Sequence, residues 1–188
     1  MKRKILSKLI EWKNKKNRKP LIVNGARQVG KTYILKEFGS HYYEKMAYVN
    51  CDKNKTLDKI FSQDYNISRI LLSLSAILHV NIEPENTLII FDEIQENPTV
   101  LNSLKYFCED ASQYHVAVAG SLLGISLHRD TSFPVGKVDM IKMYPMTFDE
   151  FLMAIDEQPL VDVLASKDFS IIDSLSVRLI DRLRQYYY

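Results

Sequence analysis

The sequence predicts an α/β protein, a three-layer sandwich in which helices cover both faces of a mainly parallel central sheet. Segments of strand character alternate with segments of helical spacing, and this order is typical of parallel α/β folds. Two segments, 88–91 and 116–119, are uninterrupted apolar runs, as in strands that are buried on both faces. A glycine-containing loop also joins an early strand to the helix that follows it, which is a common unit of such folds.

Five elements are expected in the first half of the chain. Residues 3–13 place apolar side chains on one side of a basic amphipathic helix. Residues 20–24 form a short apolar run of strand character, and residues 32–38 carry apolar residues at helical spacing. A second strand is expected at 46–50. Residues 66–79 predict an apolar-rich helix that ends before an asparagine and a proline.

The second half continues the alternation. Residues 87–92 predict a buried strand, and a helix is expected from Pro98 to residue 107, because proline favours the first turn of a helix. Another buried strand is expected at 115–121, and residues 138–144 alternate as a further strand. Two C-terminal helices are expected, at 147–156 and 170–186.

Composition limits the class of protein. With 188 residues, of which 46% are hydrophobic, the chain can form one domain, or one domain and part of another, with a real core. The formal charge of +2 gives no global field that requires a nucleic acid or a membrane as partner. Two cysteines make no disulfide framework, and no apolar stretch has the length of a membrane span. We therefore expect a cytoplasmic protein without a membrane partner.

Residues 25–32 read GARQVGKT, a complete GxxxxGK[ST] phosphate-binding loop between a strand and a helix. Backbone N–H groups of such a loop point at phosphate oxygens, at the positive end of the helix dipole. Lys31 is expected to reach the β- and γ-phosphates, and the Thr32 hydroxyl to bind Mg²⁺. A glycine-bearing surface turn is the alternative. The expected nucleotide-binding residues are Gly25, Ala26, Arg27, Gln28, Val29, Gly30, Lys31 and Thr32.

Two carboxylates, Asp92 and Glu93, follow the apolar run at 88–91. They are expected at the carboxyl edge of the sheet, where open α/β sheets bind ligands. Asp92 would face Mg²⁺ through its water shell, and Glu93 would polarise a water for in-line attack on the γ-phosphate. A solvated strand end or a helix cap is the alternative for this pair. The sequence thus predicts a phosphate-loop NTPase with Mg²⁺ at Thr32 and Asp92.

The expected nucleotide is ATP, because the motifs of GTP-binding proteins are missing from the sequence. Asp92 is followed by Glu-Ile-Gln, so there is no DxxG motif, and Asn54-Lys55 is followed by Thr-Leu, so there is no NKxD motif. No arginine-bearing lid typical of small-molecule kinases stands out either.

Further motifs carry a family resemblance. The phosphate loop is followed in order by Phe-Asp-Glu-Ile-Gln at 91–95, Ala-Gly-Ser at 119–121, Phe-Pro-Val-Gly-Lys-Val at 133–138 and Tyr-Pro-Met-Thr-Phe-Asp-Glu-Phe-Leu at 144–152. This set resembles prokaryotic AAA-type ATPases of a poorly characterised group, in which an N-terminal ATPase domain is joined to a C-terminal domain of unknown function.

The resemblance covers about residues 5–188 and implies a division of the chain. A helix and basic linker would occupy 1–19, the AAA-type core 20–156, and a helical segment 157–188. That segment would lead to the C-terminal domain, which is absent from this sequence and is expected to act as the partner driven by ATP. The tyrosines at 186–188 are expected to pack against it.

The resemblance also implies roles for two single residues. Ser121 lies where AAA-type ATPases keep their first sensor, so its hydroxyl would hold the attacking water or the γ-phosphate beside Glu93. A helix N-cap is the alternative for Ser121, and the two are not exclusive. Arg129 lies roughly where such proteins place an arginine that acts on a neighbour's nucleotide, which leaves a homo-oligomer open. A plain surface arginine is the favoured interpretation of Arg129.

Histidines and a basic run give two weaker signals. The four histidines show no ligand spacing, so no metal is expected beyond the Mg²⁺ of the nucleotide. The basic run could contact nucleic-acid phosphates, although a solvated face and linker is the favoured interpretation. The run consists of Lys13, Lys15, Lys16, Arg18 and Lys19.

Two classes of function remain open from the sequence. One is an ATP-hydrolysing enzyme, in which Glu93, Lys31 and Ser121 carry the chemistry and turnover drives work elsewhere. The other is an ATP-gated switch or interaction module with little turnover, in which binding sets partner affinity.

Overall fold

The computed structural model describes residues 3–121 and 133–187 of the chain. These residues form two compact units. One comprises Ser7–Tyr144, and the other combines the residues up to Leu6 with those from Pro145 onward. The domain boundaries expected after residues 19 and 156 stay a prediction.

The unit Ser7–Tyr144 is built on a sheet that, within the described residues, has five strands in the order β2-β3-β4-β1-β5. Every neighbouring pair is parallel, so all strands end at the same edge. This confirms the predicted α/β fold class with its mainly parallel sheet. The strands are β1 (Leu21–Gly25), β2 (Lys45–Asn50), β3 (Thr87–Asp92), β4 (His115–Ser121) and β5 (Asp139–Met143).

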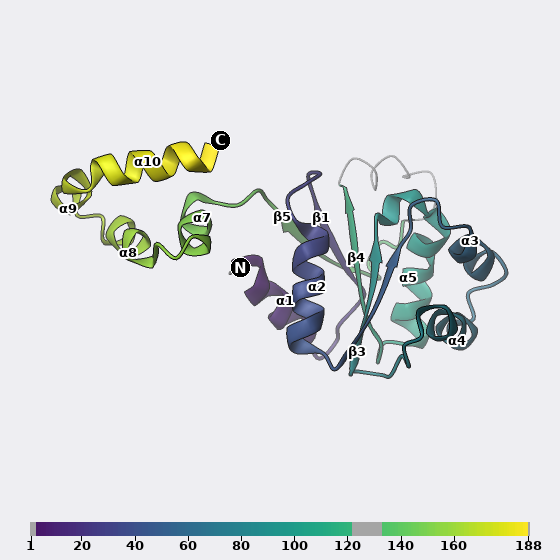
Figure 1. The fold of residues 1–188 in the computed structure, drawn as a ribbon. Coiled ribbons are helices and arrows are strands. Elements are labelled where there is room, and N and C mark those ends of the chain that lie inside the picture. Colours follow the sequence, from purple (N-terminus) through teal and green to yellow (C-terminus); the bar gives the residue numbers. More distant parts are fainter. Residues whose placement is uncertain (1–2, 122–132, 188) are drawn as a thin grey trace. The chain divides into compact units, whose positions relative to one another are not determined.

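Helices cover both faces of the sheet (Figure 1). Helix α2 lies on one face, and α3, α4 and α5 lie on the other, which gives the three layers expected from the sequence. A short 3₁₀ helix, η1 (Ile94–Glu96), follows β3 directly. The helices up to this point are α1 (Ile5–Lys13), α2 (Lys31–Tyr42), α3 (Lys55–Phe61), α4 (Ile67–Leu78) and α5 (Pro98–Asp110).

Burial on both faces explains the apolar runs of the central strands. All residues of β3 and β4 are buried, and successive side chains of a strand point to opposite faces. Ile89 and Phe91 belong to the same apolar cluster as Phe107 of α5, while on the other face α2 buries Ile34 and Phe38. Each fully buried side chain of this size contributes about 1.5–3 kcal/mol to folding. The sheet is therefore a rigid platform for whatever lies at its carboxyl edge.

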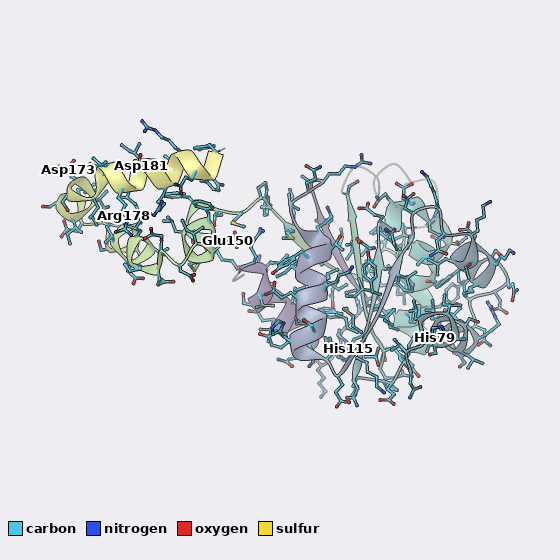
Figure 2. All side chains as sticks on the ribbon, in the orientation of Figure 1. His79, His115, Glu150, Asp173, Arg178 and Asp181 are labelled. Atoms are coloured by element: carbon cyan, nitrogen blue, oxygen red, sulfur yellow. The ribbon has the colours of Figure 1, made fainter. Side chains whose placement is uncertain are left out.

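The unit from Pro145 onward is helical. A capping box of Thr147 and Glu150 begins its first helix. Further along, Glu157 accepts hydrogen bonds from Arg178 and Arg182, each at 2.7 Å; Figure 2 labels Glu150 and Arg178. The helices are α7 (Phe148–Ala154), α8 (Gln158–Ser166), α9 (Phe169–Ser174) and α10 (Ser176–Tyr187).

Helix α3 has no counterpart among the predicted elements, and α8 lies within the segment 157–188, for which the sequence predicts helix without separate bounds. One expectation about helices is wrong. The single helix expected at 170–186 is divided, because the Leu175 N–H closes α9 on the carbonyls of Ile171 and Ile172 and α10 begins anew at Ser176. The packing expected for the tyrosines at 186–188 against a further domain stays a prediction. Within the described residues, Tyr186 packs against the start of its own helical unit. Its hydroxyl donates to the Met146 carbonyl at 2.5 Å, and its ring contacts two phenylalanines of α7.

Candidate functional site

The loop between β1 and α2 turns through left-handed backbone conformations. Gln28 has a φ of 64° and Gly30 a φ of 92°. Gly30 is the N-cap residue of α2, and its carbonyl accepts the Ile34 N–H at 3.0 Å. The amides that close the loop therefore lie at a helix N-terminus, where unpaired N–H groups and the helix dipole favour an anion.

Gly25, the first residue of the loop motif, lies between two strand neighbours. It is paired with Ser121 of β4 on one side and with Met143 of β5 on the other. A Cβ atom at position 25 would lie 2.3 Å from the Met143 carbonyl oxygen. The close approach of β5 therefore requires glycine here, independently of any turn.

Lys31 is buried at the start of α2, with 9% of its surface exposed. Its ammonium Nζ donates hydrogen bonds to the carbonyl oxygens of Gly25 and Ala26, at 3.2 and 2.7 Å. Burial lowers the pKa of Lys31 from its ordinary value, while Glu93 and Asp92 act in the opposite direction. The ammonium is thus hydrogen-bonded to the loop carbonyls and lies within the electrostatic field of the Asp92 and Glu93 carboxylates.

Asp92 ends β3 with its carboxylate buried and hydrogen-bonded. The Tyr48 hydroxyl of β2 donates to its Oδ2 at 2.9 Å, and the Glu93 N–H donates to its Oδ1 at 3.1 Å. Tyr48 is itself covered by the Lys36 ammonium, 3.6 Å from the ring centre. Burial, followed by the hydrogen bond to Asp92, raises the pKa of Tyr48 to about 12, so this hydroxyl stays protonated and donates a hydrogen bond to the carboxylate.

Glu93 leaves the strand in a left-handed conformation, with φ 51° and ψ 45°, and is the N-cap residue of η1. The side-chain amide of Gln95 contacts it. Nε2 of Gln95 donates to Glu93 Oε2 at 2.5 Å, and Oε1 of the same amide accepts the backbone N–H of Ser121 at 3.2 Å. Gln95 therefore joins the carboxylate after β3 to the last residue of β4.

Several of these groups, Gly30, Lys31 and Glu93 among them, line one open cavity at the carboxyl edge of the sheet. Its volume is about 710 Å³, which is within the range of small-molecule sites. Cations, hydroxyls, loop backbone and carboxylates all face it, a combination that suits a polyphosphate with a divalent cation. The lining residues are Arg27, Gln28, Gly30, Lys31, Thr32, Tyr33, Asn50, Asp52, Glu93, Glu96 and Ser121.

Comparison with known protein families agrees with a nucleotide-binding site. A family model described as an AAA domain matches residues 17–152, which is more than half of the chain. The chain belongs to this family. Membership makes it a nucleotide-binding, ATPase-like domain. No curated protein matches the chain.

The AAA domain brings most of the predicted site residues together. Lys31, Thr32, Glu93 and Ser121 line the cavity, and Asp92 is buried at the strand end beside Glu93. Sequence reasoning did not assign a role to Gln95, although it stands in the motif at 91–95, or to Tyr48. Of the remaining loop residues, Arg27, Gln28 and Gly30 line the cavity, whereas Val29 is buried.

Two residues keep open interpretations in this AAA domain. Ser121 is buried at the end of β4, and the residues directly after it lie outside the described part of the chain. The sensor and N-cap roles of Ser121 therefore both stay predictions. Arg129 also lies outside the described residues, so its role stays a prediction.

The basic run of the AAA domain contacts its own fold. Lys15 forms an ion pair with Asp139 at 2.6 Å, and Lys19 donates to the Gly136 carbonyl at 2.6 Å. Arg18 also donates to backbone carbonyl oxygens. These contacts favour the linker interpretation over a nucleic-acid surface.

The histidine of β4 has a structural environment rather than that of a metal ligand. His115, labelled in Figure 2, is buried and hydrogen-bonds the Tyr43 hydroxyl at 2.6 Å through Nδ1. Burial lowers its pKa to about 3, so the imidazole ring is neutral near pH 7. In the described part of the chain, no three His, Cys, Asp or Glu side chains gather as a metal site requires. No helix among the described residues is long and apolar enough to cross a membrane.

Proposed function

We propose that this AAA domain binds ATP and hydrolyses it with Mg²⁺. The observation that carries the proposal is that Lys31, Thr32 and Glu93 line the same cavity, at the helix N-terminus that Gly30 caps. The amides of the loop and the Lys31 ammonium would bind the phosphates by charge-assisted hydrogen bonds. The Thr32 hydroxyl and the Asp92 carboxylate offer the oxygen ligands that Mg²⁺ prefers.

In the reaction, the oxygen of a water forms a bond to the γ-phosphorus while the bond to the β–γ bridging oxygen breaks, which gives ADP and phosphate. Glu93 would accept the proton of the attacking water. Lys31 would neutralise charge on the phosphate oxygens as the bridging bond breaks. Bound Mg²⁺ would supply further neutralisation of the β- and γ-phosphate oxygens.

A second candidate function is an ATP-gated switch. It is favoured by the contacts of Lys31, whose ammonium lies on the carbonyls of Gly25 and Ala26. A bound phosphate would draw the ammonium away from these carbonyls, so binding alone would rearrange the loop. A ligand that binds one arrangement better shifts the population toward it without any turnover.

Two substitutions test the proposal. Lys31→Ala should weaken ATP binding by at least about tenfold, because it removes a charge-assisted hydrogen bond. Glu93→Gln should leave ATP affinity within about twofold and lower turnover by about 10²–10⁴, since the amide keeps the shape but cannot accept the proton. Calorimetry measures binding, and phosphate release measures turnover. Lys59→Ala and Glu11→Gln, both at exposed positions, are the matched controls.

The outcomes separate the alternatives. Parent affinity in Lys31→Ala would contradict the phosphate loop, and parent turnover in Glu93→Gln would contradict its role as base. ATP binding without turnover in the wild type would favour the switch. Repeating the assay over a range of protein concentrations tests whether turnover requires a homo-oligomer, because an assembly-dependent rate per subunit rises with concentration.

A further inference from the structure

The amide of Gln95 occupies a special position in the candidate site. It is buried, with 6% of its surface exposed, and lies in η1 between the ends of two neighbouring strands. Its Nε2 donates to Glu93 Oε2 at 2.5 Å, and its Oε1 accepts the Ser121 N–H at 3.2 Å. The nitrogen and the oxygen of this amide thus each bind a group at the end of a different strand.

The chemistry of an amide makes this bridge directional. The nitrogen of a glutamine side chain only donates and its oxygen only accepts. A carboxylate needs a donor, and a backbone N–H needs an acceptor, so a single orientation of the Gln95 amide serves both partners. Glutamate at position 95 would still accept from Ser121 but would present a second negative oxygen to Glu93.

We propose that Gln95 is a positioning residue for Glu93 in ATP hydrolysis. It holds the carboxylate by Oε2, which leaves Oε1 to accept the proton of the attacking water, and it ties that carboxylate to the end of β4. This inference rests on the proposed function of Glu93 as base. Glu93 leaves the strand in a left-handed conformation on a short 3₁₀ turn, so its side chain needs an external contact to stay in place.

The effect on turnover follows from the geometry. A misplacement of about 1 Å in a reacting group costs on the order of a hundredfold in rate. Gln95→Met keeps the length of the side chain and loses both hydrogen bonds, whereas Gln95→Glu keeps only the bond from Ser121. We expect both variants to lower kcat by about tenfold to a hundredfold and to leave the affinity for ATP within about twofold.

The decisive test is a double-mutant cycle on the 188-residue chain, with single-turnover ATP hydrolysis as readout. In the Glu93→Gln background, Gln95→Met should change the residual rate by less than about twofold, since its effect acts through the Glu93 carboxylate. Nucleotide affinity and thermal unfolding show that each variant is folded. The Ser121 amide resonance in ¹H–¹⁵N spectra should shift in Gln95→Met and stay near its original position in Gln95→Glu.

Three results with the Gln95 variants would overturn the inference in a wild type that hydrolyses ATP. They are parent turnover in Gln95→Met, an equal loss of rate in both backgrounds, and a loss of ATP affinity as large as the loss of kcat. The last two would indicate a merely structural role. A wild type that binds ATP without turnover contradicts the proposed hydrolysis and, with it, the role of Gln95. A wild type that turns over beside an unaffected Gln95→Met variant contradicts the role of Gln95 alone.

Discussion

Replacement of Gly25 by alanine tests how strand β5 shapes the phosphate loop. In the structure, the added Cβ would lie 2.3 Å from the Met143 carbonyl oxygen and 3.2 Å from its carbon. This neighbour is backbone, fixed by the pairing of β1 with β5, so it cannot rotate away as a side chain would. The strands must part by about an ångström before the contact becomes an ordinary one.

The cost can be estimated from this displacement. Overpacking in a well-packed interior costs about 1–3 kcal/mol, and a clash with backbone belongs at the upper end. For a chain of this length, each kcal/mol lowers the melting temperature by about 2–4 °C. We therefore expect Gly25→Ala to melt about 6–12 °C below the wild type. ATP affinity should fall by about tenfold or more, because Gly25 is also the first residue of the loop.

Gly39→Ala is the matched control. Its Cβ would lie 2.8 Å from the Met46 sulfur, but that atom ends a flexible side chain that can move. Gly39 lies inside α2, where alanine gains about 1 kcal/mol of helix propensity. The control should melt within about 2 °C of the wild type. Calorimetric unfolding and ATP titration of both variants provide the comparison. A Gly25→Ala protein with the stability and affinity of the wild type would refute the reasoning.

Two further predictions concern Asp92 and His115. Tyr48→Phe removes the hydroxyl that donates to Asp92 Oδ2, so the Mg²⁺ concentration that supports half-maximal ATP binding should rise about tenfold; an unchanged Mg²⁺ midpoint at fixed ATP would contradict this. Burial lowers the pKa of His115 from 6.5 to about 3, so the folded protein keeps this ring neutral where the unfolded chain is protonated. The resulting stability is present above pH 6.5 and falls by about 1.4 kcal/mol per pH unit as the pH drops from 6.5 toward 3. In denaturant titrations between about pH 6.5 and 5, His115→Phe should remove about this slope, and an unaltered slope would disprove it.

The sheet could be predicted because its strands carry a strong signal. Burial on both faces forces most residues of β3 and β4 to be apolar, so the runs stand out in the sequence. Short helices give weaker signals. Helix α3 has seven residues and depends on the Asn54 side chain, which accepts the Leu57 N–H. The break between α9 and α10 depends on backbone bonds at Leu175, for which no residue type in the sequence is diagnostic.

The candidate site likewise contains residues that the sequence predicts and residues that only the structure identifies. Lys31, Thr32 and Glu93 stand in motifs whose spacing alone predicts that they face one ligand, and all three line the cavity. Tyr48 and Gln95 could not be assigned from the sequence, since their roles come from contacts between neighbouring strand ends rather than from spacing. The strand register pairs Tyr48 of β2 with Ile90 of β3, so Asp92, two residues further along β3, lies within reach of the Tyr48 hydroxyl. This arrangement is a property of the folded sheet.

Strand ends, more than loops, determine the geometry of this site. Gly25 is paired with Ser121 across β1 and β4, and the Ser121 N–H donates to Gln95, which holds Glu93. The carbonyl of the same glycine accepts a hydrogen bond from the Lys31 ammonium. Lys31 and the Glu93 carboxylate are thus linked through consecutive contacts at the carboxyl edge of the sheet. Groups supported by strands keep their positions more closely than groups on free loops, so the carboxylates at the strand ends are positioned before any nucleotide binds. The Lys31 ammonium, in contrast, has to leave the loop carbonyls to reach a phosphate.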